Sequence, residues 1–250
     1  MNTFQEQRQF FDQHWPAMKQ AAESGGADAV INFADAFDDP SERRVLYAFA
    51  RKGLVHEEWQ GRSLDAYVAV ARAGIRECLT QARDEADPET SKKRINTANV
   101  ISYNLSADLA DCWDDPHVRE RAHFEAGLHA AEDCIRWREE LGNPPHTKSI
   151  AWWAKGIHQL SLGQTETAQE SFTTSMQFAL NANDGDDRCF GVVLGRGFAA
   201  IAGVVAGDPD GETEYEETTS IFRAQLANQE MKDDAQLGIS QLERVYLRYT

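Results

Sequence analysis

The sequence predicts an all-α protein, and three observations carry that prediction. Ala, Glu, Gln and Arg are plentiful, whereas proline and runs of β-branched residues are scarce, a composition that favours helices. Apolar residues recur at helical spacing, and no window alternates apolar and polar residues cleanly enough to predict a strand. Asp-Pro pairs recur where helices are expected to begin. Several connections are only a few residues long, which favours antiparallel helix pairs.

Helix starts are indicated by residues that satisfy the free backbone groups of a first turn. An Asp accepts hydrogen bonds from those N–H groups, and a following Pro loses no bond because its missing N–H would have been unpaired there. Asp39, Asp87 and Asp115 each precede a Pro and are expected to open helices. Ser63 is expected to cap another helix. Asp208, which also precedes a Pro, is expected to lie in a turn.

Apolar stripes between these marks predict the helices themselves. Ala66, Val70 and Ala73 form one stripe, for example, and Ile95 begins another. The expected helices, in order, cover residues 3–23 with a bend near Pro16, 27–37, 41–52, 54–60, 63–85, 89–113, 117–141, 148–162, 165–181, 187–206 and 212–248, the last broken near Asp233.

The charge balance limits the class of partner. The chain carries 41 acidic and 25 basic residues, a net charge of −16 at pH 7, and no basic cluster is evident that would offset the excess. Nucleic-acid binding draws its affinity from Lys and Arg that neutralise phosphates. We therefore expect neither nucleic acid nor an anionic membrane as a partner. The acidity either keeps the protein in solution or attracts a basic partner surface.

Cysteine usage and hydropathy predict a cytoplasmic protein. The four cysteines lie far apart and show no metal-ligand or CxxC spacing. Scattered thiols of this kind are typical of buried side chains in a reducing compartment. The N-terminal residues are polar without an apolar signal core, and no segment approaches the roughly 18 consecutive apolar residues of a membrane span.

One helix pair carries a family resemblance. The segment 150–180 has a large aromatic residue early in its first helix, small residues at the helix contact and turn, and an Ala followed one turn later by an aromatic: Trp152, Gly156, Gly163, Ala168 and Phe172. This pattern resembles the tetratricopeptide repeat. Weaker echoes occur around Ser106 and Gly195, at spacings longer than the 34 residues of that family.

The resemblance implies that antiparallel hairpins stack into a right-handed superhelix, the first helix of each pair lining a concave groove. On that basis residues 1–88 would form an N-terminal helical extension and residues 89–250 the repeats with a C-terminal capping helix, all within one continuous structure. Groove-facing positions carried over from the family select Tyr103, Ala107, Asp111, Trp153, Ile157, Leu160, Arg196 and Ala199. Proteins of this kind mostly bind peptides or other proteins.

The principal alternative is a metal site on the expected helix 117–141. Glu120 and His123 form a Glu-x-x-His pair, and Glu125 and His129 lie four residues apart on one face. A di-iron carboxylate bundle needs such a pair twice, and the chain has no second one. A small-ligand sensor that encloses a compound in an aromatic cavity is a further alternative.

No catalytic motif accompanies these residues, because the sequence has neither a phosphate-binding glycine loop in its required context nor a Gly-x-Ser-x-Gly elbow. We therefore expect a non-enzymatic module without a cofactor that binds a protein or peptide. The C-terminal residues 246–249 either cap the superhelix or pair with a second subunit in a homodimer.

Overall fold

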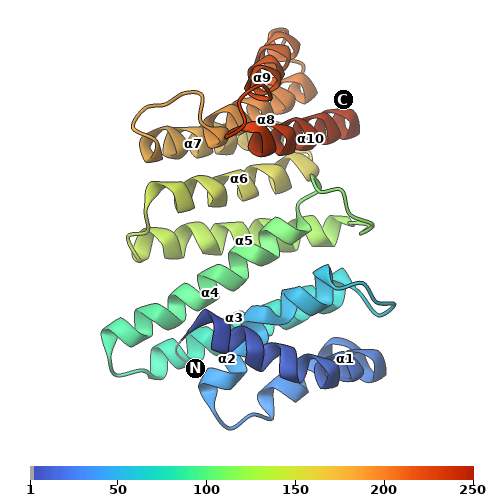
Figure 1. The fold of residues 1–250 in the computed structure, drawn as a ribbon, viewed down its shortest axis with the longest axis vertical. Helices are drawn as coiled ribbons and strands as arrows, with labels where there is room; N and C mark the ends of the chain where they lie inside the picture. Colours follow the sequence, from blue (N-terminus) through green and yellow to red (C-terminus); the bar gives the residue numbers. More distant parts are fainter. Residues whose placement is uncertain (1–2) are drawn as a thin grey trace. The chain divides into compact units, whose positions relative to one another are not determined.

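The chain folds as helices throughout the described residues. The computed structural model describes residues 3–250, which contain ten α-helices and no strand and are 79% helical overall (Figure 1). The chain divides into two compact units, Met1–Leu109 and Ala110–Thr250. We call them the N-terminal and C-terminal units. The all-α prediction is confirmed.

The N-terminal unit contains four α-helices and one π-helical turn. These are α1 (Phe4–Asp35), α2 (Pro40–Arg51), η1 (Lys52–His56), α3 (Leu64–Asp84) and α4 (Pro88–Leu109). Helix α3 packs against α2 and α4, and α1 packs against α2 and α3. The unit boundary follows Leu109, so α4 belongs to this unit, whereas the sequence interpretation divided the chain at residue 88.

Side-chain caps explain where three of these helices begin. Thr3 and Glu6 form a reciprocal capping box at the start of α1. Asp39 accepts a hydrogen bond from the Ser41 backbone N–H at 2.7 Å, and Asp87 accepts one from that of Thr90 at 2.9 Å. The two predicted Asp-Pro starts at α2 and α4 are thus confirmed, because each Asp satisfies N–H groups that the first turn leaves unpaired.

Glycines decide two interruptions in the N-terminal unit. Gly26 has φ of 62°, which breaks the long α1 between the predicted helices 3–23 and 27–37. Gly53 lies against the indole of Trp15, where an added Cβ would meet ring carbon at 2.4 Å. The predicted helix 54–60 is wrong, because the chain widens into η1 here and the Trp59 indole donates to the Gly53 carbonyl at 2.9 Å.

The C-terminal unit is a succession of six helices that pack against their neighbours in sequence (Figure 1). They are α5 (Arg121–Glu140), α6 (Pro145–Ser161), α7 (Thr165–Ala182), α8 (Phe190–Ala206), α9 (Gly211–Gln225) and α10 (Lys232–Tyr249). The predicted break in the last segment is confirmed, although it spans the residues between Gln225 and Lys232. The expected turn at Asp208 is also present, with the Asp210 backbone N–H bound to its carboxylate at 3.1 Å.

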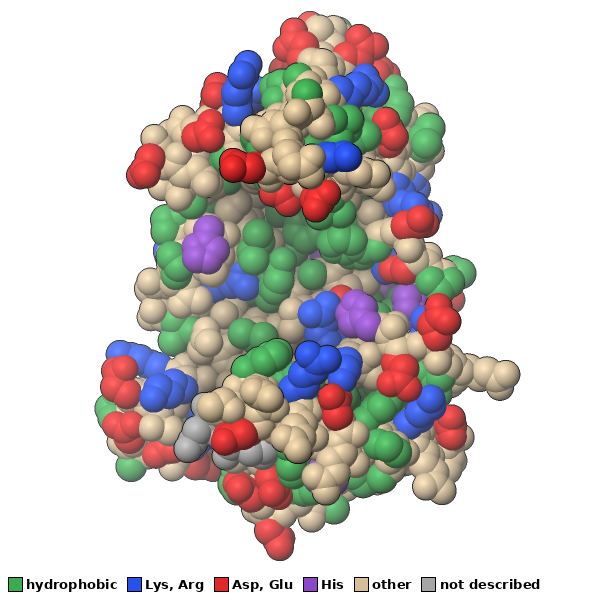
Figure 2. Space-filling view, viewed as in Figure 1, with side chains coloured by type: hydrophobic (Ala, Val, Ile, Leu, Met, Phe, Trp, Pro, Cys, Tyr) green, Lys and Arg blue, Asp and Glu red, His purple; other side chains and the backbone are tan. Residues whose placement is uncertain are grey.

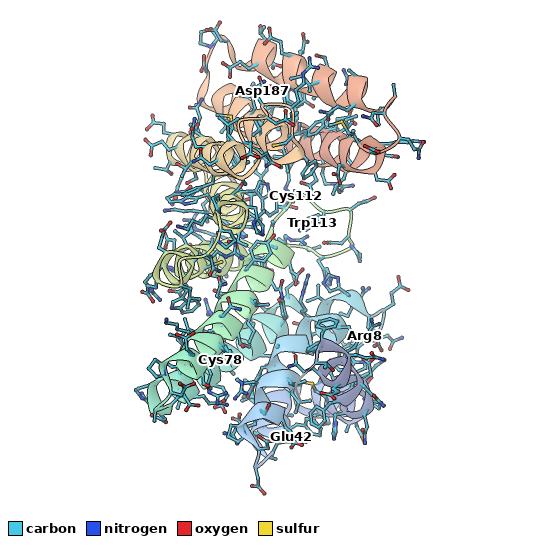
Figure 3. The ribbon with its side chains drawn as sticks, turned by 60° about the vertical axis from the view of Figure 1, so that its left-hand side comes forward. Arg8, Glu42, Cys78, Cys112, Trp113 and Asp187 are labelled. Carbon is cyan, nitrogen blue, oxygen red and sulfur yellow. The ribbon has the colours of Figure 1, made fainter. Side chains whose placement is uncertain are left out.

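The segment between α4 and α5 corrects two predicted boundaries. The helix expected to reach residue 113 ends at Leu109, and the helix expected from residue 117 begins at Arg121. The Asp115 carboxylate accepts hydrogen bonds from the His117 backbone N–H and from the buried Arg119 guanidinium. Those bonds hold a turn instead of a helix cap. Figure 3 shows Cys112 and Trp113 in this segment.

The α6–α7 hairpin has the local packing that the sequence predicted. Gly163 has φ of 78° in the connecting turn, and an added Cβ on Gly156 would meet the Phe172 ring at 2.6 Å. Ala168 and Phe172 are fully buried. Small residues therefore let the two helices approach closely around a large one.

Hydropathy of the helices bears on membrane insertion. Among the described residues, none of the helices combines the length and the apolar character that crossing a bilayer requires.

Candidate functional site

The groove residues predicted on α6 lie in the interior of the C-terminal unit. Ile157 and Leu160 are 0% and 2% exposed, and Trp153 is also buried. The Trp153 ring packs edge-on against Trp113 and Phe198, with centroids 6.2 and 6.3 Å away. Helix α6 packs between α5 and α7, so neighbours cover it on two sides. These three side chains contribute to the core and do not line a surface open to a partner.

The five predicted groove residues outside α6 are not gathered into one surface. Asp111 is buried and forms an ion pair with Arg248 of α10. Arg196 is half-buried on α8. Tyr103 is half-buried on α4, in the N-terminal unit. Ala107 is buried on α4, and Ala199 is half-buried on α8. The eight predicted residues are therefore divided between the two units and between interior and surface.

The four residues of the alternative metal site have separate structural roles. Glu120 is the N-cap of α5, and its backbone N–H donates to Nδ1 of the buried His123 at 2.9 Å. Glu125 pairs with Arg121 at 2.8 Å, and the exposed His129 lies 3.8 Å from Glu132. No three His, Cys, Asp or Glu side chains converge as metal ligands anywhere in residues 3–250. This arrangement gives the metal alternative no support.

The N-terminal unit instead carries a groove that the sequence interpretation did not identify. Two hollows, of about 590 and 400 Å³, are each lined by residues of α1, α2 and α4. They adjoin, because Gln7, Ala48 and Thr97 line both. We call the larger one the apolar hollow, the smaller one the polar hollow, and the two together the groove.

Helical periodicity explains how each wall of the groove forms. Phe4, Gln7 and Arg8 lie on one face of α1, since positions three and four apart are neighbours on a helix surface. The walls from α2 and α4 follow the same rule, with Arg44, Ala48 and Arg51 on one and Lys93, Thr97, Val100 and Asn104 on the other.

The floor of the apolar hollow exposes apolar surface. The Phe4 side chain is 71% exposed, and its ring centroid lies 5.4 Å from that of the half-buried Phe49. Val100 on α4 is 42% exposed, and Ala48 also lines this hollow. Large exposed apolar side chains gathered in one concavity are typical of an interaction site.

The rim of the groove is basic although the protein is acidic. Six Lys and Arg side chains line the two hollows, and none of the described lining residues is Asp or Glu: the six are Arg8, Arg44, Arg51, Lys52, Lys93 and Arg94. Three carboxylates behind the lining, Asp12, Glu85 and Asp108, form ion pairs with members of this set. Figure 2 shows basic, imidazole and apolar side chains side by side on this face.

A buried carboxylate holds one of these cations in position. Asp108, which is 6% exposed, accepts hydrogen bonds from Arg51 Nε at 2.9 Å and Nη2 at 2.6 Å. The Tyr67 hydroxyl donates to the same carboxylate at 3.0 Å, and His56 Nε2 lies 3.4 Å from it. Burial alone would raise the pKa of Asp108, but hydrogen bonds from His56 and Arg51 outweigh it and lower that pKa.

The π-helical turn brings an ammonium group and an imidazole to the groove. Lys52 and His56 begin and end η1, and both line the apolar hollow. Within the turn, the contact between Gly53 and Trp15 leaves no room for a side chain. Single π-helical turns occur frequently at functional sites. Figure 3 shows Arg8 on α1, the remaining cation of this hollow.

Comparisons with known proteins find no match to this chain among family models, curated proteins or solved structures. The functional interpretation therefore rests on the geometry of the groove.

Proposed function

We propose that this protein is a non-enzymatic binding module and that the groove on its N-terminal unit holds an extended, acidic peptide segment of a partner protein. The observation that carries this proposal is an exposed apolar floor beneath six basic side chains in a chain of net charge −16. Charge complementarity selects an acidic segment, and the floor adds contact for an apolar side chain.

Amide groups on α4 favour a peptide backbone as the ligand. Asn96 and Asn104 both line the apolar hollow, and their Oδ1 atoms accept from Asn99 at 3.4 Å and Arg51 at 3.3 Å. Their Nδ2 groups donate to no described residue, so they are available to backbone carbonyls. The two residues are about 12 Å apart along the helix axis, a distance that roughly four residues of extended chain would span.

Exposure favours a peptide over an enclosed small molecule. Phe4 and Val100 retain 71% and 42% of their accessible surface, so the apolar hollow is not closed over a cavity. A ligand there remains open to solvent along the groove, which suits a chain that continues beyond both ends. A small-ligand sensor, the alternative function considered from the sequence, would instead enclose its compound in an aromatic cavity.

We also propose that the C-terminal unit forms a tetratricopeptide-like superhelix that acts as a scaffold. Consecutive helices there pack together, and the α6–α7 hairpin has the small-against-large contact of Gly156 and Phe172. Stacked hairpins of this kind provide extended surfaces for further partners. The predicted contribution of Asp111 and Arg196 to such a surface stays a prediction, whereas Tyr103 lies in the N-terminal unit.

Fluorescence anisotropy with two synthetic peptides tests the groove. The acidic probe is a fluorescein-labelled peptide in which Glu pairs flank Leu and Phe, and the basic probe replaces every Glu with Lys. We expect the acidic probe to bind and the basic probe not to bind. The double variant Arg8→Glu, Lys52→Glu should weaken acidic-probe binding on the order of tenfold or more at low salt.

A matched variant separates local charge from net charge. Arg136→Glu with Arg223→Glu makes the same change at exposed sites of the C-terminal unit, and it should leave binding within about twofold. Equal loss in both double variants, or preference for the basic probe, would remove the groove as the binding site.

A further inference from the structure

The polar hollow has the composition of an oxyanion site. It is lined by three basic side chains and three hydroxyls, together with Gln7 and two small apolar residues; the six polar groups are Ser41, Arg44, Thr90, Lys93, Arg94 and Thr97. Guanidinium and ammonium groups donate charge-assisted hydrogen bonds to oxyanions, which are among the strongest in proteins. Two of the hydroxyls already donate within the protein, Thr90 to Asp87 and Thr97 to the Lys93 carbonyl. The adjoining apolar hollow contributes no such cluster of hydroxyls.

Arg44 is a half-buried cation bound only by neutral acceptors. Its Nη1 donates to the Pro40 carbonyl at 3.2 Å and to the Gln81 side-chain oxygen, and it forms no ion pair within residues 3–250. Burial is the main cause that lowers the pKa of Arg44, and the nearby positive charge of Arg94 lowers it further. Arg44 and Arg94 line the same hollow, and a bound anion there would offset the repulsion between their like charges.

The carboxylates near the polar hollow are already engaged. Glu85 accepts from Arg94 Nη2 at 2.8 Å. Asp87 accepts from the backbone N–H and the hydroxyl of Thr90 at 2.9 and 2.5 Å, as the cap of α4. Lys93, by contrast, is exposed and forms no ion pair with any described residue. Two further carboxylates near Arg44 are also engaged, Asp39 with the Ser41 backbone N–H and Glu77 with Arg43. The charged side chains that line the hollow itself are all basic.

We propose that the polar hollow binds the phosphate group of a phosphorylated side chain, while an apolar side chain of the same peptide occupies the apolar hollow. This inference rests on the proposed function, because it assigns the ligand class at one end of the same groove. A phosphate carries a charge near −2 and three strong acceptor oxygens. It therefore uses the donors of Arg44, Lys93 and Arg94 more fully than a carboxylate with two oxygens does.

Long-range charge argues against a polyanion as the ligand. The cations of the groove attract an anion within a few ångströms, but the net charge of −16 repels an extended polyanion over the rest of the surface. A single phosphate on a peptide places its charge only where the excess of cations lies. Single-stranded RNA is accordingly included in the test as a competing ligand.

Three peptides that differ at one position test this inference. The acidic probe described above is made with Ser, Glu or phosphoserine at a single internal position, and each is titrated into the full chain by anisotropy. We expect the phosphoserine peptide to bind at least about tenfold more tightly than the Ser peptide, with the Glu peptide in between. Arg44→Gln should abolish most of the difference between the phosphoserine and Ser peptides, because it weakens binding of the phosphoserine peptide by a larger factor than binding of the Ser peptide.

A surface pair on α4 supplies a control that does not depend on the half-buried Arg44. Lys93→Gln should reduce the preference for phosphoserine by roughly threefold to tenfold. Lys92→Gln removes the neighbouring exposed charge, which pairs with Glu89 at 2.9 Å and does not line the hollow, and it should leave the preference unchanged. Circular dichroism establishes that each variant is folded.

The outcomes separate the two proposals. Equal affinity for all three peptides, unaffected by Arg44→Gln, would overturn the phosphate assignment and leave the peptide groove standing. Absence of binding by every peptide would overturn both. Tighter binding of a single-stranded RNA oligonucleotide than of the phosphopeptide, lost in Lys93→Gln, would replace the phosphorylated side chain with a phosphodiester.

Discussion

Asp108 illustrates how a single buried side chain serves the groove. Its carboxylate accepts hydrogen bonds from Arg51 and Tyr67 and lies close to His56. These bonds fix the side chain of Arg51 at the rim of the groove. Removing one partner of a buried ion pair leaves an uncompensated charge in a region of low dielectric. At this scale, stability and binding depend on the same interaction.

Replacement of Asp108 is expected to destabilise the N-terminal unit. Asp108→Asn should lower the free energy of unfolding by about 3 kcal/mol at neutral pH, as measured by urea denaturation. Asp114→Asn removes an exposed carboxylate that pairs with Arg244 at 2.7 Å, and it should change stability by less than about 1 kcal/mol. Similar effects of the two substitutions would contradict the role given to the buried pair.

The same carboxylate gives a pH dependence with a defined sign. The folded pKa of Asp108 lies below its ordinary value of 3.8, so the ionised form stabilises the folded state. That contribution is fully present above the unfolded pKa and is lost as pH falls through the folded pKa. The stability difference between wild type and Asp108→Asn should therefore narrow as pH decreases below 3.8. A stability difference that widens as the pH falls would contradict the lowered pKa of Asp108.

Close helix contacts at the element scale depend on positions where a side chain does not fit. Gly156 on α6 meets Phe172 of α7, and Gly53 in η1 meets Trp15 of α1. Gly156 was recognisable in the sequence, because its spacing from Gly163 and Phe172 resembled a known repeat. Gly53 carried no such signal, because nothing in its sequence neighbourhood indicates that a distant indole covers it.

A pair of glycine substitutions tests the α6–α7 contact. Gly156→Ala should lower the free energy of unfolding by about 1–3 kcal/mol, since its Cβ would meet Phe172 at 2.6 Å. Gly203→Ala, in α8, meets no atom closer than 3.5 Å, and it should be neutral or stabilising by up to about 1 kcal/mol because Ala favours helix. Thermal unfolding of both variants shows whether the loss of stability comes from the contact with Phe172 or follows from alanine at any helical glycine.

Replacement of the glycine in the π-helical turn should affect binding as well as stability. Gly53→Ala displaces the turn from Trp15 and therefore moves Lys52 and His56 at the rim of the apolar hollow. We expect weaker binding of the acidic probe by roughly threefold or more, together with lower thermal stability. A variant that loses stability but keeps full affinity would show that η1 does not position the rim.

Net charge at the scale of the whole molecule opposes the local charge of the groove. The chain carries −16, so an acidic peptide is repelled at distances beyond the reach of the six lining cations. Added salt screens that repulsion over a Debye length near 10 Å and also weakens the ion pairs made in the complex.

Kinetics should separate these two effects. In stopped-flow measurements with the acidic probe, we expect the association rate constant to rise with ionic strength and the dissociation rate constant to rise as well. An association rate constant that falls with salt would indicate that the groove attracts its ligand from long range despite the net charge.

Local sequence signals determined the helical elements of this protein. Asp39 and Asp87 cap helices because each lies directly before a Pro and a first turn with unpaired N–H groups. Composition and apolar periodicity predicted helix throughout. The start predicted at Asp115 is wrong because Arg119 and the His117 backbone bind its carboxylate instead. All of these interactions join residues that are close in sequence. The sequence does not indicate whether the Asp115 carboxylate caps a helix or binds Arg119 and the His117 backbone.

Tertiary structure alone decided which residues are accessible and which share a surface. Trp153, Ile157 and Leu160 have the spacing of a groove wall, but neighbouring helices bury them. The six cations of the groove come from three separate parts of the chain: α1, α2 with η1, and α4. Burial and proximity depend on how helices pack, and packing is set by contacts between residues far apart along the chain.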